Sequence, residues 1–130
     1  MHFTLKNRLL LKLVILILLI FSCESKQNYK GKIGMTCLDL TNPFFKLIAN
    51  VMQSEAEKYG YELVALSGDQ DPAKQNNQLS DFVAQGYNAI FLNPVDSKSA
   101  GEGVKKAHSA GIPVFTFDIQ VTDEVANNYV

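Results

Sequence analysis

Between residues 32 and 117 the chain alternates short apolar runs with longer segments in which apolar residues recur every three or four positions. The short runs are nearly continuous in apolar residues, as in strands buried on both faces, and the longer segments have the period of amphipathic helices. This alternation predicts an α/β fold, a parallel sheet with helices on both faces. The predicted strands are 32–39, 61–66, 87–92 and 112–117, and the predicted helices are 43–59, 72–85 and 97–110.

Local signals mark both ends of the predicted helices. Asn42-Pro43 and Asp71-Pro72 each place a capping residue before a proline, which suits the first helical position because that position needs no N–H partner. Glycine follows each predicted helix, at Gly60, Gly86 and Gly111. In the first helix the apolar positions form one stripe, which predicts that Phe45 is in the core and that its neighbour Phe44, about 100° away, is free for a ligand. The stripe consists of Phe45, Ile48, Met52, Ala56 and Tyr59.

Residues 1–22 have a different character. They contain three basic residues and no acidic one, and residues 13–21 are an unbroken apolar run. Nine residues are too few for a membrane span of about 20, so we predict an export signal. The remaining residues, 23–130, include 9 basic and 13 acidic side chains, a net charge of −4.

Ile20-Phe21-Ser22-Cys23 ends this segment and resembles the lipobox of bacterial lipoproteins. The resemblance implies cleavage before Cys23 and attachment of lipid to its thiol, which would anchor the protein at a membrane. Residues 23–31 are then a polar tether. An ordinary signal peptide that happens to precede a cysteine is the alternative.

Polar and aromatic side chains gather in the loops that follow the predicted strands, at 38–43, 67–71, 93–97 and 117–120. In open α/β sheets ligands bind beyond the carboxyl ends of the strands. Carboxylate and amide groups exchange hydrogen bonds with hydroxyls, and aromatic rings stack on C–H patches, so this set suits a neutral polyhydroxylated ligand. The side chains are Asp39, Asn42, Phe44, Phe45, Asp69, Asn93, Asp96, Asp118 and Gln120.

Each of the strongest candidates also has a purely structural interpretation. Asn42 could act only as a helix cap, and Asn93 before Pro94 could be turn chemistry. Asp118 at the end of a buried strand needs partners, and amides of the next loop could supply them. Asp69 and Asp71 are interpreted as loop and capping residues.

Composition and motifs argue against an enzyme or a nucleic-acid-binding protein. His2 is in the export segment and His108 is inside a predicted helix, so the loops lack a catalytic base. The chain has no G-x-G-x-x-G or Walker motif and no C-x-x-C pair, and its near-neutral charge offers no basic face. Cys37 is expected to be a small buried hydrophobic residue. We therefore predict no cofactor and no metal, although loop carboxylates holding a magnesium ion are the alternative.

Three segments together resemble the N-terminal lobe of periplasmic sugar-binding proteins of the ribose-binding type. They are IGMTCLDLTNPFF, NPVDS and GIPVFTFD, and the similarity extends over about residues 32–125. The family implies a hinged two-lobe receptor that closes on a monosaccharide or related small polyol and delivers it to the permease of an ABC importer. Its sugar-contacting positions match Asn42, Phe44, Phe45, Asn93 and Asp118, although the apolar stripe places Phe45 in the core.

The resemblance leaves substrate and pathway open. Ribose-binding members have an arginine after the last aspartate, where this chain has Ile119, so ribose itself is in doubt. A sensor module of the same fold, feeding a kinase or chemoreceptor, is the alternative to transport. LacI-type repressors share the fold, but they need an N-terminal DNA-binding segment where this chain has an export signal.

Length adds a final expectation. The chain has 130 residues, and the family's lobe needs more than residues 32–130 provide. We expect a partial lobe, an unpaired edge beside the last predicted strand, no closing element among the last twelve residues, and weak or no sugar binding by this chain alone.

Overall fold

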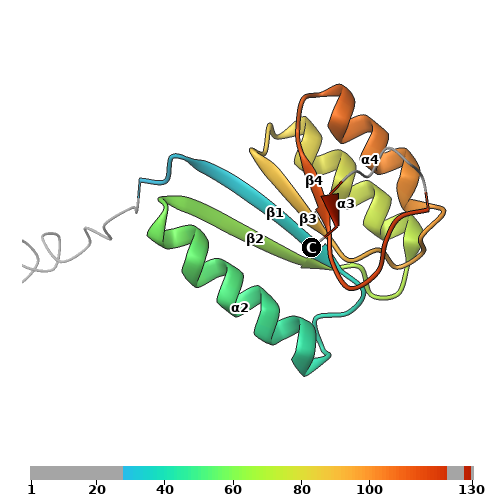
Figure 1. Cartoon of the computed structure of the whole chain (residues 1–130), viewed down its shortest axis with the longest axis horizontal. Helices are drawn as coiled ribbons and strands as arrows, with labels where there is room; N and C mark the ends of the chain where they lie inside the picture. Colours follow the sequence, from blue (N-terminus) through green and yellow to red (C-terminus); the bar gives the residue numbers. More distant parts are fainter. Residues whose placement is uncertain (1–27, 123–127, 130) are drawn as a thin grey trace, which may run out of the picture.

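Strand and helix alternate along the chain in the computed structural model, which describes residues 28–122 and 128–129 (Figure 1). The strands are β1 (Gly31–Cys37), β2 (Tyr61–Ser67), β3 (Ala89–Leu92), β4 (Val114–Thr116) and β5 (Asn128–Tyr129). The helices are α2 (Pro43–Lys58), α3 (Pro72–Ala84) and α4 (Ala100–Ser109). The predicted order of seven elements is confirmed.

All strand pairs are parallel, and the sheet order is β2-β1-β3-β4-β5. β1 pairs with β2 along its whole length, from Gly31 opposite Tyr61 to Cys37 opposite Ser67. On its other side β1 pairs with β3, which in turn pairs with β4. The loops after β1, β3 and β4 therefore emerge side by side at one edge of the sheet.

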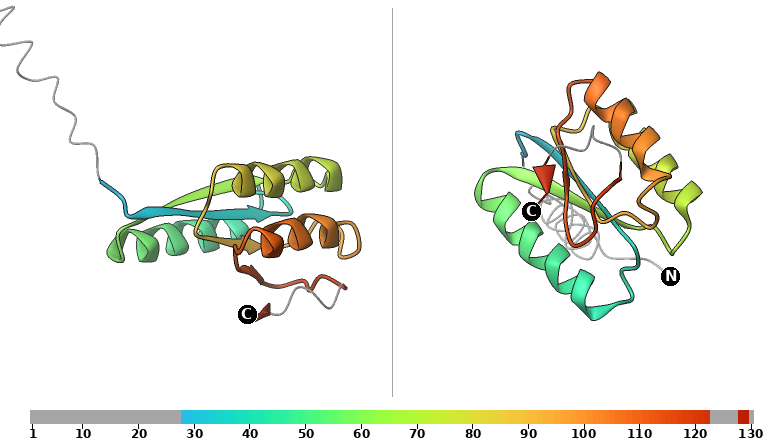
Figure 2. Two further views of the ribbon diagram at one scale, coloured as in Figure 1. Left: turned by 90° about the horizontal axis from the view of Figure 1, so that it is seen from above. Right: turned by 45° about the vertical axis from the view of Figure 1, so that its right-hand side comes forward.

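Helices cover both faces of the sheet, which confirms the predicted fold class (Figures 1 and 2). α2 packs on one face, where Phe45, Ala49 and Ala56 meet Met35, Cys37 and Leu63. α3 and α4 lie together on the other face, over Ile90, Leu92 and Val114. This division follows from the strands, whose alternate side chains point to opposite faces and are apolar on both.

α4 approaches α3 closely at Gly103. A Cβ at this position would lie 2.5 Å from Leu79 Cδ1 and 2.9 Å from Asn76 Oδ1, so a larger residue would require these two side chains to shift. The predicted helix stops are confirmed as well. Gly60, Gly86 and Gly111 have φ angles of 82°, 68° and 76°, in the left-handed region that glycine adopts without strain.

Several predicted boundaries differ from the structure. α4 begins at Ala100 rather than near Ser97, because the Asp96 carboxylate accepts from the backbone N–H of Ser99 at 2.7 Å and of Lys98 at 3.2 Å and holds a turn there. β3 and β4 are shorter than predicted: β3 begins two residues later, and β4 begins two residues later and ends one residue earlier.

The expectation of an unpaired β4 edge is wrong. β5 lies beside β4, with Asn128 opposite Phe115 and Tyr129 opposite Thr116. Its two residues fall among the last twelve, for which no element was predicted, because a two-residue strand has too few positions to show a period.

The predicted export signal (1–22), Cys23 and most of the predicted tether lie outside the described residues. Within 28–122 and 128–129, none of the helices is long and apolar enough to cross a membrane.

Candidate functional site

Asn42 is the N-cap of α2, as its sequence context predicts. Its backbone is extended, with φ −69° and ψ 122°, and its side-chain Oδ1 accepts from the backbone N–H of Phe44 at 3.0 Å. Pro43 follows as the first helical residue. Because the cap uses the side-chain oxygen, the NH2 group of Asn42 is the part that can face a ligand. Capping and ligand binding are thus compatible.

Phe44 and Phe45 divide between surface and core. Phe45 is 4% exposed and packs among the residues under α2, whereas Phe44 is 53% exposed. Their rings meet edge to face, 5.2 Å apart at 68°. The predicted core position of Phe45 is confirmed, and Phe44 offers the accessible ring face. A contact of either ring with sugar stays a prediction.

Asn93 directly follows β3 and is completely buried. Its side-chain Oδ1 accepts from the backbone N–H of Leu38, after β1, at 3.1 Å. Its Nδ2 donates to the carbonyl of Phe117 at 3.3 Å and to Asp118 Oδ2 at 3.1 Å, both after β4. One amide therefore joins the ends of three strands. That placement favours holding the site together over direct contact with a ligand.

Asp118 lies at the surface where β4 ends. The backbone N–H of Ile119 donates to the carbonyl of Phe117 at 2.7 Å, which closes a three-residue turn around Asp118. The φ angle of Asp118 is 62°, a left-handed value that aspartate tolerates better than most residues. The side-chain amide of Asn93 is one partner of this carboxylate, at 3.1 Å. The carboxylate is thus oriented but exposed, as a ligand-binding group would be.

The other loop carboxylates form hydrogen bonds with neighbouring residues and stabilise the loops in which they lie. Asp39 accepts from the backbone N–H and the hydroxyl of Thr41, each at 2.8 Å, and these bonds lower the pKa of its carboxyl. Lys74, with a second bond from Ser67, lowers the pKa of Asp69. Backbone bonding from Ser99 lowers the pKa of Asp96. We assign these three carboxylates to loop structure.

Asp71 caps α3, accepting from the backbone N–H groups of Ala73 at 2.8 Å and Lys74 at 3.2 Å. The interpretation of Asp69 and Asp71 as loop and capping residues is therefore confirmed. Gln120 is exposed, and Ile119 is 37% exposed beside Asp118.

The side chains of Cys37 and His108 are not available to a ligand at this edge of the sheet, because Cys37 ends β1 but packs in the core under α2 and His108 is in α4. Cys37 is completely buried, as expected, and desolvation raises the pKa of its thiol from 9.0 to about 11, so the thiol is protonated and unreactive at neutral pH. His108 is near the C-terminal end of α4, at the opposite edge of the sheet. In the part of the chain that the structure describes, no group of three or more His, Cys, Asp or Glu side chains could hold a metal ion.

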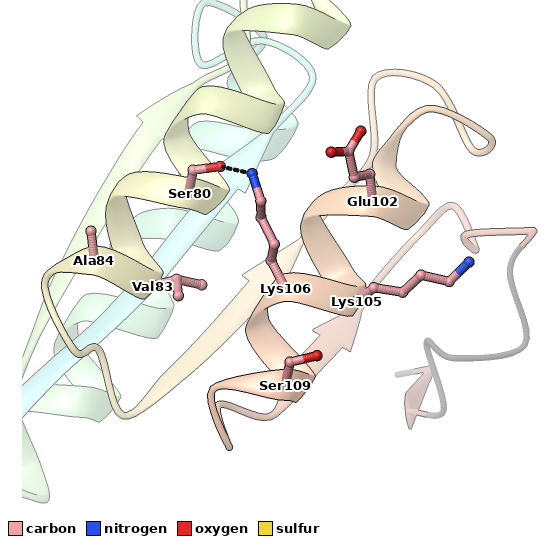
Figure 3. Close-up of a pocket in the computed structure, with 7 residues that line it drawn as sticks. All are labelled: Ser80, Val83, Ala84, Glu102, Lys105, Lys106 and Ser109. Atoms are coloured by element: carbon pink, nitrogen blue, oxygen red, sulfur yellow. Dashed lines mark hydrogen bonds between the residues drawn. The ribbon is translucent and has the colours of Figure 1, made fainter.

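A cavity of about 530 Å³ lies between α3 and α4, lined in part by Ser80, Glu102 and Lys106 (Figure 3). Lys106 Nζ lies 3.5 Å from Ser80 Oγ across it. The cavity is on the outer surface of the helices, away from the strand ends. None of the predicted site residues lines it.

Sequence reasoning missed two polar residues that contact the strand ends, Gln75 and Gln78 of α3. They are only 2% and 9% exposed. A signal for them existed, because position 75 is four residues before Leu79 and position 78 is four before Phe82, on the apolar face of the helix. The polarity of the two side chains suggested exposure to solvent, but their spacing indicated a buried position facing the core.

Comparison with known proteins identifies a family that this chain matches. Residues 33–130 match the model of the periplasmic binding protein domain. The ribose import binding protein of Escherichia coli is 40% identical over 93 residues, which cover 72% of this chain and 31% of that protein. The D-apiose import binding protein of Paraburkholderia graminis is 38% identical over 95 residues, covering 68% of this chain and 30% of that protein.

A solved structure of a solute-binding protein also matches this chain. The ABC transporter solute-binding protein from Mycobacterium smegmatis, with bound glycerol, matches with a TM-score of 0.71 and 33% identity over 77% of this chain and 34% of that one. The chain thus spans about a third of the length of the relatives it matches.

Proposed function

The chain belongs to the periplasmic binding protein domain family, and we propose that it forms one wall of a sugar site in a receptor for an ABC importer. The ligand would be a monosaccharide or a related small polyol, and the partner would be the importer's permease. The proposal is one of binding rather than catalysis. The family implies an exported protein that works outside the cytoplasmic membrane.

One observation carries the proposal: the Asn93 amide ties the loop after β1 to the Asp118 carboxylate after β4. The carboxylate is thereby held at the edge of the sheet where α/β proteins bind ligands. A fixed, charged acceptor makes strong hydrogen bonds to hydroxyl groups. The exposed ring of Phe44, on the helix that follows β1, adds a surface on which the C–H face of a sugar can stack.

Relatives support the choice of ligand class. The names of the matched proteins refer to ribose and D-apiose, and a solved relative holds glycerol. All three ligands carry several hydroxyl groups and no charge. Asn42, Phe44, Phe45, Asn93 and Asp118 are the residues that we propose for contact or support of such a ligand.

Ligand-observed NMR tests this function on the full chain, purified from the membrane fraction in detergent. Saturation transfer is measured to a panel of aldoses and polyols. The length of the chain leaves weak binding or none as expectations, and the proposed function requires weak binding. We therefore expect transfer to at least one sugar, with a dissociation constant above about 1 mM.

Asp118→Asn should strongly reduce the transfer, because it removes the charged acceptor. Asp71→Asn is the matched control, because asparagine caps helices as well as aspartate does. Absence of transfer to every sugar, or equal transfer with Asp118→Asn, would contradict the proposal.

We also propose that lipid on Cys23 anchors the protein to a membrane surface. The proposal rests on Ile20-Phe21-Ser22-Cys23, directly after the apolar run. Each buried CH2 of an acyl chain contributes about 0.8 kcal/mol, so several chains would retain the protein firmly.

A further inference from the structure

Two buried amides of α3 face the carboxyl ends of the strands. Gln75 and Gln78 are one helical turn apart, and both point toward the sheet rather than toward solvent. Glutamine is mostly an exposed residue, and a buried amide is costly unless its donors and acceptors find partners. The partners of these two side chains therefore indicate what the pair does.

Gln75 forms hydrogen bonds with the backbone on both sides of Pro94, in the segment after β3. Its Nε2 donates to the carbonyl of Asn93 at 2.9 Å, and its Oε1 accepts from the backbone N–H of Val95 at 2.8 Å. If the amide were flipped, its Oε1 would face the carbonyl of Asn93 and its NH2 group would face the N–H of Val95. Only the observed orientation therefore satisfies both bonds. With one hydrogen bond on each side of Pro94, the Gln75 side chain fixes the backbone of Asn93.

Gln78 makes the equivalent contacts at β1 and β2. Its Oε1 accepts from the Thr36 hydroxyl at 2.6 Å, and its Nε2 donates to the carbonyl of Ser67 at 2.8 Å. Gln75 Nε2 also lies 3.3 Å from the Thr36 hydroxyl oxygen, which links the two amides. Thr36 is itself completely buried, so water does not compete for these bonds.

Each amide acts on the loop after β1 through an intermediate residue. Gln75 fixes Asn93, whose side chain accepts from the Leu38 N–H and donates to Asp118. Gln78 fixes Ser67, whose hydroxyl accepts from the Leu40 N–H at 3.1 Å. The loop that leads to Asn42 is thus held at two points.

We propose that Gln75 and Gln78 are positioning residues that set the geometry of the candidate sugar site without touching the ligand. Gln75 orients the Asp118 carboxylate through Asn93, and Gln78 supports the loop before Asn42 through Ser67. The link to sugar binding rests on the function proposed above, whereas the positioning itself does not.

Hydrogen exchange and side-chain NMR on the full ¹⁵N-labelled chain in detergent test the positioning without any sugar. The informative signals are the side-chain NH2 resonances of Asn93 and the backbone N–H of Leu38. Gln75 does not contact the Leu38 N–H, so a change there must be transmitted through Asn93. Gln75→Met keeps the length of the side chain but removes both bonds. Gln75→Glu keeps the acceptor for Val95 and removes the donor to Asn93.

In both Gln75 variants we expect a shift of the Asn93 NH2 signals and exchange at Leu38 at least about tenfold faster, as for a weakened buried hydrogen bond. Gln78→Met should accelerate exchange at Leu40 instead and spare Val95. Val104→Ala is the control, because Val104 is buried in the same α3–α4 core but lies outside the network. It should lower overall stability without these local changes.

Unchanged Asn93 and Leu38 signals in a folded Gln75 variant, or the same changes in Val104→Ala, would overturn the proposal. If neither Gln75 variant folds, Leu40 exchange in Gln78→Met decides it in the same way. Sugar saturation transfer on the same samples separates the two proposals. If the unmodified chain shows none, the proposed function fails, and the exchange data still decide the positioning.

Discussion

At the level of single residues, the candidate site depends on how one buried amide is used. Asn93 has no exposed surface, yet its side chain bonds to the segments after β1 and β4. Asp118, which bonds to Asn93, and Phe44, on α2, are exposed and can reach a ligand. In our proposal, support of the site and contact with the ligand are therefore assigned to different residues, and substitutions should separate the two roles.

Phe44 and Phe45 allow that separation to be measured at adjacent positions. Phe45→Ala should destabilise the protein by about 3–5 kcal/mol, because it leaves a cavity in the core under α2. Phe44→Ala should cost no more than about 1 kcal/mol, the loss of one edge-to-face ring contact, but should reduce sugar saturation transfer. Urea denaturation gives the free energies of unfolding. Similar losses of stability for the two variants would contradict this division between core and surface.

Among the elements, α3 has the widest role. One of its faces packs Leu79 and Phe82 into the core, and the same face carries Gln75 and Gln78 to the strand ends. Its N-terminus is fixed by Asp71 and Pro72, which sets the position of the first turn and hence of Gln75 one turn further on. The start of this helix thus influences both stability and the site.

Removing that cap should have a predictable cost. Asp71→Ala should lower the free energy of unfolding by about 1 kcal/mol, because the N–H groups of Ala73 and Lys74 lose their acceptor. Asp71→Asn should change it little, since asparagine caps equally well. Chemical denaturation of the three proteins measures the difference. A loss with Asp71→Asn as large as that with Asp71→Ala would show that charge, rather than capping, is responsible.

For the whole molecule, the main features are membership of the family and a length about a third of that of the matched relatives. The described residues provide one sheet edge with an oriented carboxylate, an exposed aromatic ring and a capping asparagine. In our proposal this edge is one wall of a binding site. In that proposal, buried amides hold the polar groups of the wall in place before a ligand binds, which lowers the cost of ordering them on binding.

The proposed anchor also belongs to the whole molecule. Cys23→Ser should move the protein from the membrane fraction to the soluble fraction and abolish incorporation of labelled palmitate, because the hydroxyl replaces the acylated thiol. Cys37→Ala removes the other cysteine and should leave both properties unchanged. Membrane association is measured by fractionation and acylation by palmitate labelling, for the unmodified protein and both variants. Membrane retention of Cys23→Ser would contradict the anchor proposal.

The sequence by itself determined the fold class, the order of the elements from β1 to β4, the helix caps and the core position of Phe45. These depend on periodicity and on short-range backbone chemistry, which neighbouring residues settle. The candidate loops were found in the same way, since parallel strands bring their carboxyl ends to one edge whatever their order.

Only the tertiary structure decided what Asn93, Gln75 and Gln78 do. Asn93 joins Leu38 and Asp118, 55 and 25 positions away, because β3 lies between β1 and β4 in the sheet. No local pattern encodes that strand order. The two glutamines have polar side chains on an apolar helix face, and only the buried carbonyl, hydroxyl and N–H groups opposite them explain why the amides are there.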